Sequence, residues 1–263
     1  MVFLNAEAYE RLMGRWSRRL APLLVEFAGI ADGDRVLDVG AGTGSLSLAV
    51  LAVARRSEVI GIDPSGPYVE YARSRTSDPR VRFEVGDAQA LAYPDASFHK
   101  TLALLVMNFI PDARKAAAGM RRVTKSGGVV AAAVWDYGDG MTMLRTFWDA
   151  AVALDPDAEP RHERHMPYCR KGELSALWTA SGLKEAKETS LVVPLDFESF
   201  EDFWQPFLTG QGPSGSYATS LPAERQQALR ERLRRELSGE KPDMPFTLQA
   251  RAWAVRGIVP SQP

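Results

Sequence analysis

Three glycines at alternate positions follow a short apolar run near the start of the chain. The run Arg35–Val39 predicts a buried strand that carries Asp38 near its end. Glycine lets the backbone turn tightly and lets a ligand lie directly on the main chain. The next residues, Ser45 to Ala54, predict a helix whose first turn offers free N–H groups. The segment therefore predicts a nucleotide-type cofactor site built around Gly40, Gly42 and Gly44.

The spacing of these glycines distinguishes between cofactors. The dinucleotide fingerprint is G-x-G-x-x-G, but the sixth position is Ser45 counted from Gly40 and Ser47 counted from Gly42. The observed pattern, Asp-x-Gly-x-Gly-x-Gly from Asp38, resembles the first motif of the class I S-adenosylmethionine-dependent methyltransferases. A carboxylate at Asp38 also suits a ligand with an ammonium and a sulfonium group better than it suits a pyrophosphate.

Acidic residues also follow two further predicted strands. Val59–Asp63 places Asp63 about 20 residues beyond the glycines, where a carboxylate can bind ribose hydroxyls. Val81–Val85 alternates like a strand and leads to Asp87. The resemblance implies that Asp87 accepts a hydrogen bond from the adenine amino group and that the Ala88 backbone faces the ring.

The resemblance assigns the cofactor to the strand ends and to the N-terminal segment. In similar enzymes that segment folds over the cofactor, so we expect Tyr9 and Trp16 to close the pocket and Arg15 to pair with the cofactor carboxylate. The alternative is that Trp16 belongs to the core and Arg15 to the surface. The remaining expected cofactor-binding residues are Asp38, Gly40, Ala41, Gly42, Thr43, Gly44, Asp63, Pro64, Asp87, Ala88, Gln89, Leu104 and Leu105. The resemblance is to the small-molecule, methyltransferase type 11 or ubiquinone-biosynthesis-like group.

Strands and helices alternate through the first half of the chain, which predicts a parallel, doubly wound sheet. A fourth strand is expected over residues 101–107 and a fifth over 129–135, with closing strands over 188–195 and 247–255. The resemblance implies that the last strand runs antiparallel. The expected fold class is α/β, a doubly wound, mostly parallel, seven-stranded sheet of the Rossmann-like methyltransferase fold with helical cap insertions.

The chain is expected to have three parts: a helical segment over the cofactor site at 1–30, the Rossmann-like core at 31–136, and the remainder of the sheet at 137–263. Two stretches of the third part are too long for plain connections. We expect these cap segments, about 137–170 and 197–245, to cover the active site.

Two local expectations concern proline and glycine. Pro22 should break the N-terminal helix, since proline removes a backbone donor inside a helix. The glycine- and serine-rich run from Gly210 to Ser216 should be a flexible connection.

Candidates for the acceptor side follow the fourth and fifth strands and lie in the first cap segment. Similar enzymes often have a histidine near the position of Asn108, so one obvious base is missing. No catalytic residue is assigned, and the weak candidates are His162, His165, Asp136 and Tyr137. A histidine can titrate near neutrality and act as a base, but the histidine pair also fits a surface loop. With no third ligand at suitable spacing, no metal is expected. The expected substrate-binding residues are Asn108, Phe109 and Trp135.

Composition narrows the range of partners. The 263-residue chain has a formal net charge of −1 and one cysteine, Cys169, so no global field attracts it to nucleic acid or to an anionic membrane. It contains no apolar run long enough to span a bilayer, and its start lacks the apolar core of a signal peptide. We therefore expect a cytoplasmic protein, with its oligomeric state left open.

The leading interpretation is S-adenosylmethionine-dependent methyl transfer to a small-molecule acceptor by in-line displacement. Such a reaction needs a general base only if the acceptor must lose a proton, and the motifs leave open whether oxygen, nitrogen or carbon is methylated. One alternative is a non-catalytic S-adenosylmethionine-binding module, because an intact cofactor loop does not establish an acceptor pocket. A nicotinamide-dependent oxidoreductase is disfavoured by the glycine spacing.

Overall fold

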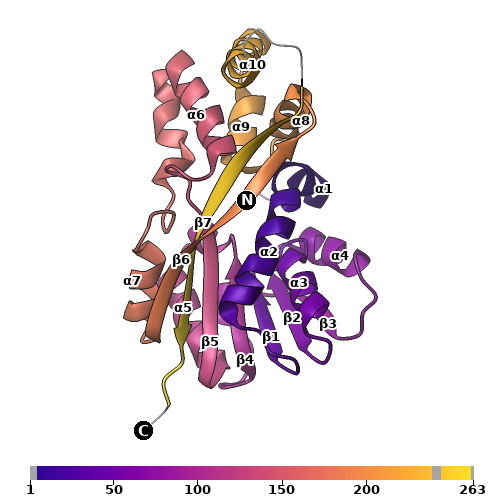
Figure 1. The fold of residues 1–263 in the computed structure, drawn as a ribbon, viewed down its shortest axis with the longest axis vertical. Coiled ribbons are helices and arrows are strands. Elements are labelled where there is room, and N and C mark those ends of the chain that lie inside the picture. The colour runs from indigo at the N-terminus through magenta and orange to yellow at the C-terminus, as the bar shows by residue number, and fades with distance from the viewer. Residues whose placement is uncertain (1–4, 239–243, 262–263) are drawn as a thin grey trace.

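The computed structural model describes residues 5–238 and 244–261. Its centre is a seven-stranded sheet in the order β3-β2-β1-β4-β5-β7-β6 (Figure 1). All pairings are parallel except those of β7, which runs antiparallel to both β5 and β6. This is the expected mostly parallel α/β fold. The strands are β1 (Arg35–Val39), β2 (Glu58–Asp63), β3 (Val81–Val85), β4 (Phe98–Leu104), β5 (Thr124–Trp135), β6 (Lys184–Phe197) and β7 (Phe246–Ile258).

Helices connect these strands and form a separate group at one end of the sheet. In Figure 1, α6, α8, α9 and α10 lie together at the end toward which the long β6 and β7 extend. The helices are α1 (Ala6–Tyr9), α2 (Arg15–Ala28), α3 (Ser45–Val53), α4 (Gly66–Ser74), α5 (Ala113–Val123), α6 (Thr142–Leu154), α7 (Glu173–Ala180), α8 (Phe200–Trp204), α9 (Gly212–Ser220) and α10 (Ala223–Ser238). A π-helical turn, η1 (Glu10–Gly14), joins α1 to α2, and the short 3₁₀ turns are η2 (Ala88–Ala90), η3 (Met107–Phe109), η4 (Pro156–Arg161), η5 (Glu163–His165) and η6 (Gln205–Thr209).

The central strands are buried because helices pack on the sheet. From Val130 to Trp135 every residue of β5 is fully buried, as expected for a strand covered on both faces. At the opposite end of the sheet from the glycines, His99 of β4 accepts a hydrogen bond from the backbone N–H of Arg35 at 2.8 Å, and its other ring nitrogen lies 2.8 Å from Nζ of Lys125. His99 thus ties three neighbouring strands together, a structural role.

Several strand boundaries differ from the sequence expectation, and two of them have a local cause. The fourth strand was expected to run to residue 107, but β4 ends at Leu104 because Leu105 adopts a positive φ of 60°. The chain then turns through η3, which lifts Asn108 away from the strand direction. The fifth strand begins early, at Thr124, and Gly127 absorbs the irregularity with a φ of 75°.

The expected helix break at Pro22 is wrong. Pro22 lies inside α2, which continues to Ala28 and ends at Gly29 in the left-handed conformation. The buried face of α2 packs on the rest of the protein both before and after Pro22. Leu20 and Leu24 on this face are both fully buried. That burial offsets the lost backbone hydrogen bond, which is the main cost of proline in a helix.

The glycine-rich run is also not a flexible connection. Gly210 turns with a φ of 75°, and α9 begins at Gly212 with Pro213 in its first turn, a favoured place for proline. A Cβ on Gly215 would lie 3.0 Å from the backbone carbon of Gly210. These glycines therefore permit close packing of α9 on the turn before it.

Among the described residues, no helix combines the length and the apolar character required to cross a bilayer.

Candidate functional site

The glycine loop, residues 40–44, leaves the end of β1 through three left-handed glycines. Their φ angles are 71° at Gly40, 54° at Gly42 and 87° at Gly44, a region that favours glycine. A Cβ on Gly40 would lie 2.5 Å from Val106, whereas one on Gly42 would meet nothing closer than Tyr68 at 3.9 Å. Gly40 and Gly44 are thus required for packing, and Gly42 leaves the backbone open to a ligand.

Asp38 is a fully buried carboxyl group beneath this loop. Its Oδ2 accepts hydrogen bonds from the backbone N–H of Ser47 at 3.0 Å and from the Ser47 hydroxyl at 2.7 Å. Its Oδ1 is buried and has no partner among the described residues. Burial raises the pKa of Asp38 to about 7, although the Ser47 bonds act in the opposite direction. An unpaired buried oxygen is costly, so this position suits a ligand that brings a donor or a positive charge.

Asp63 ends β2 beside the loop. Val39 pairs with Ile62 in the sheet, which brings Asp63 level with the glycines. Its carboxylate accepts hydrogen bonds from the backbone N–H of Gly42 at 3.0 Å and of Ser65 at 2.8 Å. Burial raises the pKa of Asp63, and these two bonds counteract that rise. The exposed Pro64 follows it and leads into α4.

The segment after β3 forms the third edge of this region. Asp87 is exposed and caps η2 by accepting a hydrogen bond from the Gln89 backbone at 2.8 Å. Ala88 is buried, and the Gln89 side chain accepts a bond from the Asp112 backbone at 3.1 Å. One carboxylate oxygen of Asp87 therefore organises the turn, and the carboxylate stays accessible.

A small cavity of about 30 Å³ lies over the glycine loop; we call it the loop cavity. Asp38, Leu104 and residues 40–43 line it, together with Tyr9 and Ser17 of the N-terminal segment. The Tyr9 hydroxyl lies 3.0 Å from the Ser17 hydroxyl, and burial raises the pKa of Tyr9 to about 12. The N-terminal segment thus covers the loop, and a ligand larger than a water molecule requires it to move.

Arg15 and Trp16 do not line the loop cavity. The Arg15 guanidinium binds both carboxylate oxygens of Asp202, at 2.8 and 3.0 Å, and stacks 4.3 Å over the Trp16 ring. Trp16 is 1% exposed and packs edge-on against Phe197 at 5.3 Å. The structure therefore places Trp16 in the core and pairs Arg15 with α8, because Asp202 supplies the carboxylate expected from the cofactor.

A second cavity, the cap cavity, lies next to the first and measures about 40 Å³. Tyr9 lines both cavities, and the successive residues Leu104 and Leu105 line one each. The strand ends, both cap segments and the N-terminal segment therefore meet at one place beside the glycine loop. The other residues of the cap cavity are Leu12, Met13, Phe109, Trp135, Tyr137, Leu144, Glu163, Gly212, Pro213 and Ser214.

Two expected acceptor-side residues have unused polar atoms, and one of them, Trp135, lines the cap cavity. Trp135 is fully buried in the wall of the cap cavity, and its indole N–H has no partner among the described residues. Asn108 is 5% exposed; its amide donates a long contact to the sulfur of Met166 at 3.9 Å, and its Oδ1 is buried without a partner. Tyr137 lines the cavity, and burial raises its pKa well above the usual range.

Asp136 does not join this group. Its carboxylate binds Arg251 of β7 at 2.5 and 2.8 Å and accepts a hydrogen bond from the Asp139 backbone at 3.1 Å. The strong pair with Arg251 makes Asp136 a structural link between β5 and β7. The expectation of a catalytic Asp136 is therefore not supported by its position.

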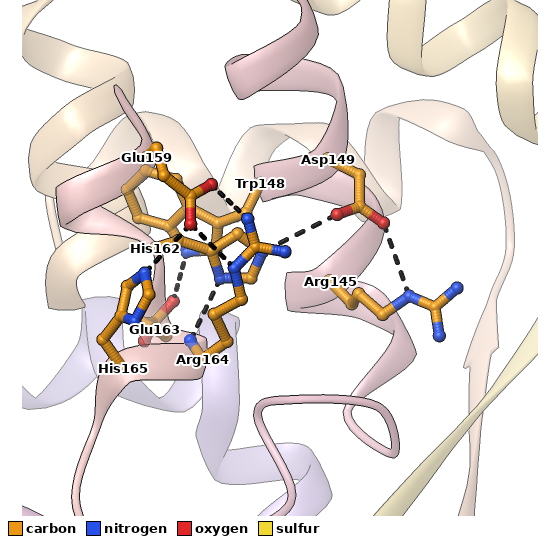
Figure 2. Close-up of polar contacts among 8 residues, drawn as sticks. All are labelled: Arg145, Trp148, Asp149, Glu159, His162, Glu163, Arg164 and His165. Carbon is orange, nitrogen blue, oxygen red and sulfur yellow. Dashed lines mark hydrogen bonds and ion pairs between the residues drawn. The ribbon is translucent and has the colours of Figure 1, made fainter. Parts of the chain in front are cut away.

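The two histidines of the first cap segment have different environments, and neither lines either cavity. His162 is 2% exposed and stacks on Trp148, and its Nε2 lies 3.7 Å from Asp149 (Figure 2). Burial and the nearby Arg164 lower the pKa of His162. His165 is exposed, with Nε2 3.0 Å from Glu159. The surface-loop interpretation fits His165, whereas His162 is a packing residue.

Glu163, which lies between these histidines, was missed. It is 4% exposed, lines the cap cavity, and accepts a hydrogen bond from the Trp148 indole at 2.7 Å (Figure 2). Burial raises the pKa of Glu163 to about 7, although the hydrogen bonds from Trp148 and Ser214 act to lower it. In the sequence it lies in an Arg-His-Glu-Arg-His run, which is typical of a solvated loop. A single 3₁₀ turn has no periodicity that could have revealed which side chain is buried.

No group of three or more His, Cys, Asp or Glu side chains in residues 5–238 and 244–261 is arranged to hold a metal ion.

Comparison with known proteins identifies the domain. Residues 36–128 match the family model of a methyltransferase domain. An uncharacterized protein of Mycobacterium tuberculosis is 30% identical over 175 residues, which cover 64% of this chain and 63% of that protein. The 2-methyl-6-phytyl-1,4-hydroquinone methyltransferase of Synechocystis is 31% identical over 186 residues, covering 68% of this chain and 56% of that enzyme. The chain thus spans less than two thirds of the length of these relatives.

A solved structure shares the fold over nearly the whole chain. The Haemonchus contortus phosphoethanolamine N-methyltransferase 2, in complex with S-adenosyl-L-methionine, has a TM-score of 0.61 and 18% identity, and the match covers 97% of this chain and 57% of that one. At this identity the likeness concerns the fold. Residues 36–128 thus match a methyltransferase domain, and the chain has the fold of a methyltransferase structure.

Proposed function

We propose that this protein transfers a methyl group from S-adenosylmethionine to a small, largely apolar acceptor. The observation that carries the proposal is the buried Asp38 oxygen without a partner beneath an open glycine loop. Neither Asp38 nor Asp63 forms an ion pair with another described residue. The site therefore offers carboxylates to a ligand that carries positive charge, and S-adenosylmethionine carries both an ammonium and a sulfonium.

The residues present fit this cofactor. In the proposal, Asp38 accepts from the ammonium group, Asp63 from the ribose hydroxyls and Asp87 from the adenine amino group. The open backbone at Gly42 allows the ligand to lie on the main chain, and Tyr9 covers it. When bound, S-adenosylmethionine supplies an electrophilic methyl group.

The chain's own contribution is alignment and exclusion of water. An acceptor in the cap cavity lies next to the loop cavity, because Tyr9 lines both cavities and the successive residues Leu104 and Leu105 line one each. Holding two reactants in line accounts for a large part of such a rate enhancement. The mostly apolar wall of the cap cavity keeps water out and favours a small acceptor with an apolar body. The Synechocystis relative, named for a hydroquinone substrate, supports this class of acceptor.

Titration calorimetry tests the proposal. Micromolar binding of S-adenosylmethionine and S-adenosylhomocysteine, without binding of NAD, is expected for the wild-type protein. Asp63→Ala should abolish it, and Glu58→Gln, an exposed carboxylate at the other end of the same strand, should retain it. Failure to bind either adenosyl compound would overturn the proposal. Binding without methyl transfer to any of a broad acceptor panel would favour the non-catalytic module.

A further inference from the structure

Glu163 is the one carboxylate among the described residues that line the cap cavity. The neighbouring walls are apolar, and the Trp148 indole N–H donates to Glu163 Oε2 at 2.7 Å. Ser214 also donates to this carboxylate. A carboxylate has about four acceptor positions, so these two bonds fix the group and leave further capacity. The side chain is therefore held at the edge of an apolar pocket with room to accept one more donor.

No cation neutralises Glu163 among the described residues. The basic groups on its own segment face other partners: Arg164 and His165 bind Glu159, and His162 faces Asp149 (Figure 2). Arg161 lies over the Tyr217 ring. The ion pairs of the described chain do not include Glu163. From the other elements, the titratable groups that face the cavity are the hydroxyls of Tyr137 and Tyr9, with the Cys169 thiol beyond Tyr137.

The cavity also holds an unused donor. The Trp135 indole N–H lies in the same wall without a partner among the described residues. A buried donor and a buried acceptor on one apolar pocket select a ligand that supplies both complementary groups. A hydroxyl on an apolar body does so, because its O–H donates and its oxygen accepts.

We propose that Glu163 binds the acceptor hydroxyl and serves as its proton acceptor, which makes the substrate class small phenols or related hydroxyl compounds. This rests on the proposed methyl transfer. As the acceptor oxygen forms its bond to the methyl carbon, its O–H bond breaks and the proton passes to a Glu163 carboxylate oxygen. The carbon–sulfur electron pair leaves with sulfur as a neutral thioether, so charge and atoms balance.

The pKa of Glu163, raised to about 7 by burial, agrees with this role. A base is most effective when its pKa lies near the working pH. Below this pH the group is protonated and a poor acceptor, and above it the carboxylate accepts a strong, charge-assisted bond. Preference for a hydroxyl ligand should therefore rise as pH increases through about 7.

Phenol and its methyl ether anisole are the probes for this test, because a methyl group in anisole replaces the proton that Glu163 would accept. Calorimetry with S-adenosylhomocysteine present, at pH 6 and pH 8, measures binding of each. At pH 8 wild-type protein should bind phenol about tenfold or more tighter than anisole. Glu163→Gln, which keeps an acceptor for Trp148, should reduce that preference to about threefold or less. Glu159→Gln, a half-exposed carboxylate four residues away, should retain it.

The outcomes separate this inference from the proposed function. If S-adenosylhomocysteine binds but wild-type protein binds phenol and anisole equally, or Glu163→Gln keeps the full preference, the role of Glu163 is overturned while the cofactor site stands. If Glu163→Gln does not fold, the wild-type pH series decides. A several-fold loss of phenol preference from pH 8 to pH 6 supports the inference, and a constant preference contradicts it.

Discussion

The loop cavity and the cap cavity meet at Tyr9 but are built in opposite ways. The loop cavity is mostly backbone and adjacent strand ends, drawn from residues close in the sequence. The cap cavity is formed by side chains from four distant parts of the chain, among them Leu12, Trp135, Glu163 and Pro213. The first region holds the proposed cofactor site, and the second holds the proposed acceptor site.

This difference suggests which kind of change each region tolerates. A backbone-built site depends on φ angles and close approaches, so small additions of volume are costly there. A side-chain-built site can exchange groups of similar size with little loss of stability, while its ligand preference changes.

Gly40→Ala should cause the largest loss of stability. Its φ of 71° disfavours a side chain, and the new Cβ would lie 2.5 Å from Val106. Gly33→Ala is the matched control, since Gly33 has a φ of 92° with nothing within 4 Å. Urea unfolding should show a loss of about 3 kcal/mol for Gly40→Ala and about 1 kcal/mol for the control. Equal losses would mean that strain alone, without the contact to Val106, explains the glycine.

Asp38→Asn should weaken S-adenosylmethionine binding by about 10- to 100-fold, because it removes a charged acceptor from a buried position. The amide can still accept the two Ser47 bonds, so the fold should persist. Calorimetry of the folded variant measures this loss. An unchanged affinity would show that the buried Asp38 oxygen does not face the cofactor.

The stability of the ligand-free protein should depend on pH through the same residue. The pKa of Asp38 is about 7 when folded and near 4 when unfolded. The folded protein therefore holds a proton that the unfolded chain releases, and stability falls as pH rises from about 4 to about 7. Stability measured by urea unfolding should fall between pH 5 and pH 8, and this fall should be about 2–3 kcal/mol smaller in Asp38→Asn than in wild type. An equal fall in both proteins would contradict this assignment.

Tyr9→Ala should loosen the wall that the loop cavity and the cap cavity share at Tyr9. Losing the ring, which lies 5.6 Å from the Tyr68 ring, should speed cofactor dissociation about tenfold in stopped-flow measurements. Tyr9→Phe keeps the ring and loses the hydroxyl that contacts Ser17, so it should stay close to wild type. If both variants release the cofactor at the wild-type rate, the N-terminal segment is not a cover for the site.

Arg15→Gln should have the smallest effect. The Arg15–Asp202 pair is partly exposed, at 24% and 30%, and should contribute about 1 kcal/mol or less to stability. Cofactor affinity should change less than twofold in calorimetry. A tenfold loss of affinity would instead support the sequence-based expectation that Arg15 binds the cofactor carboxylate.

The same contrast explains what the sequence could predict. The glycine spacing, Asp38 and Asp63 were predictable because a strand, a turn and a helix in series place them at one sheet edge. The pairing of Arg15 with Asp202 depends on a contact between residues 187 positions apart, and no local pattern reveals it. The structural role of Asp136 likewise depends on its ion pair with Arg251 of β7, the last strand.

The remaining errors have physical causes of the same kind. Pro22 lies inside α2 because the burial of this helix in the folded protein outweighs the low helix propensity of proline. The run at Gly210 became a helix start because its glycines allow close packing, which composition alone does not distinguish from flexibility. Glu163 is buried only because α6 and α9 close over it, so its chemistry emerges with the fold.

A crystal structure of the protein with S-adenosylhomocysteine and phenol tests the central claim most directly. The account predicts the nucleoside over the glycine loop with its ribose on Asp63, and phenol in the cap cavity with its oxygen within hydrogen-bonding distance of Glu163. It also predicts that Tyr9 contacts both ligands from the side and leaves the phenol oxygen facing the sulfur. A nucleoside bound elsewhere, or phenol outside the cap cavity, would contradict the view that these two cavities form one active site.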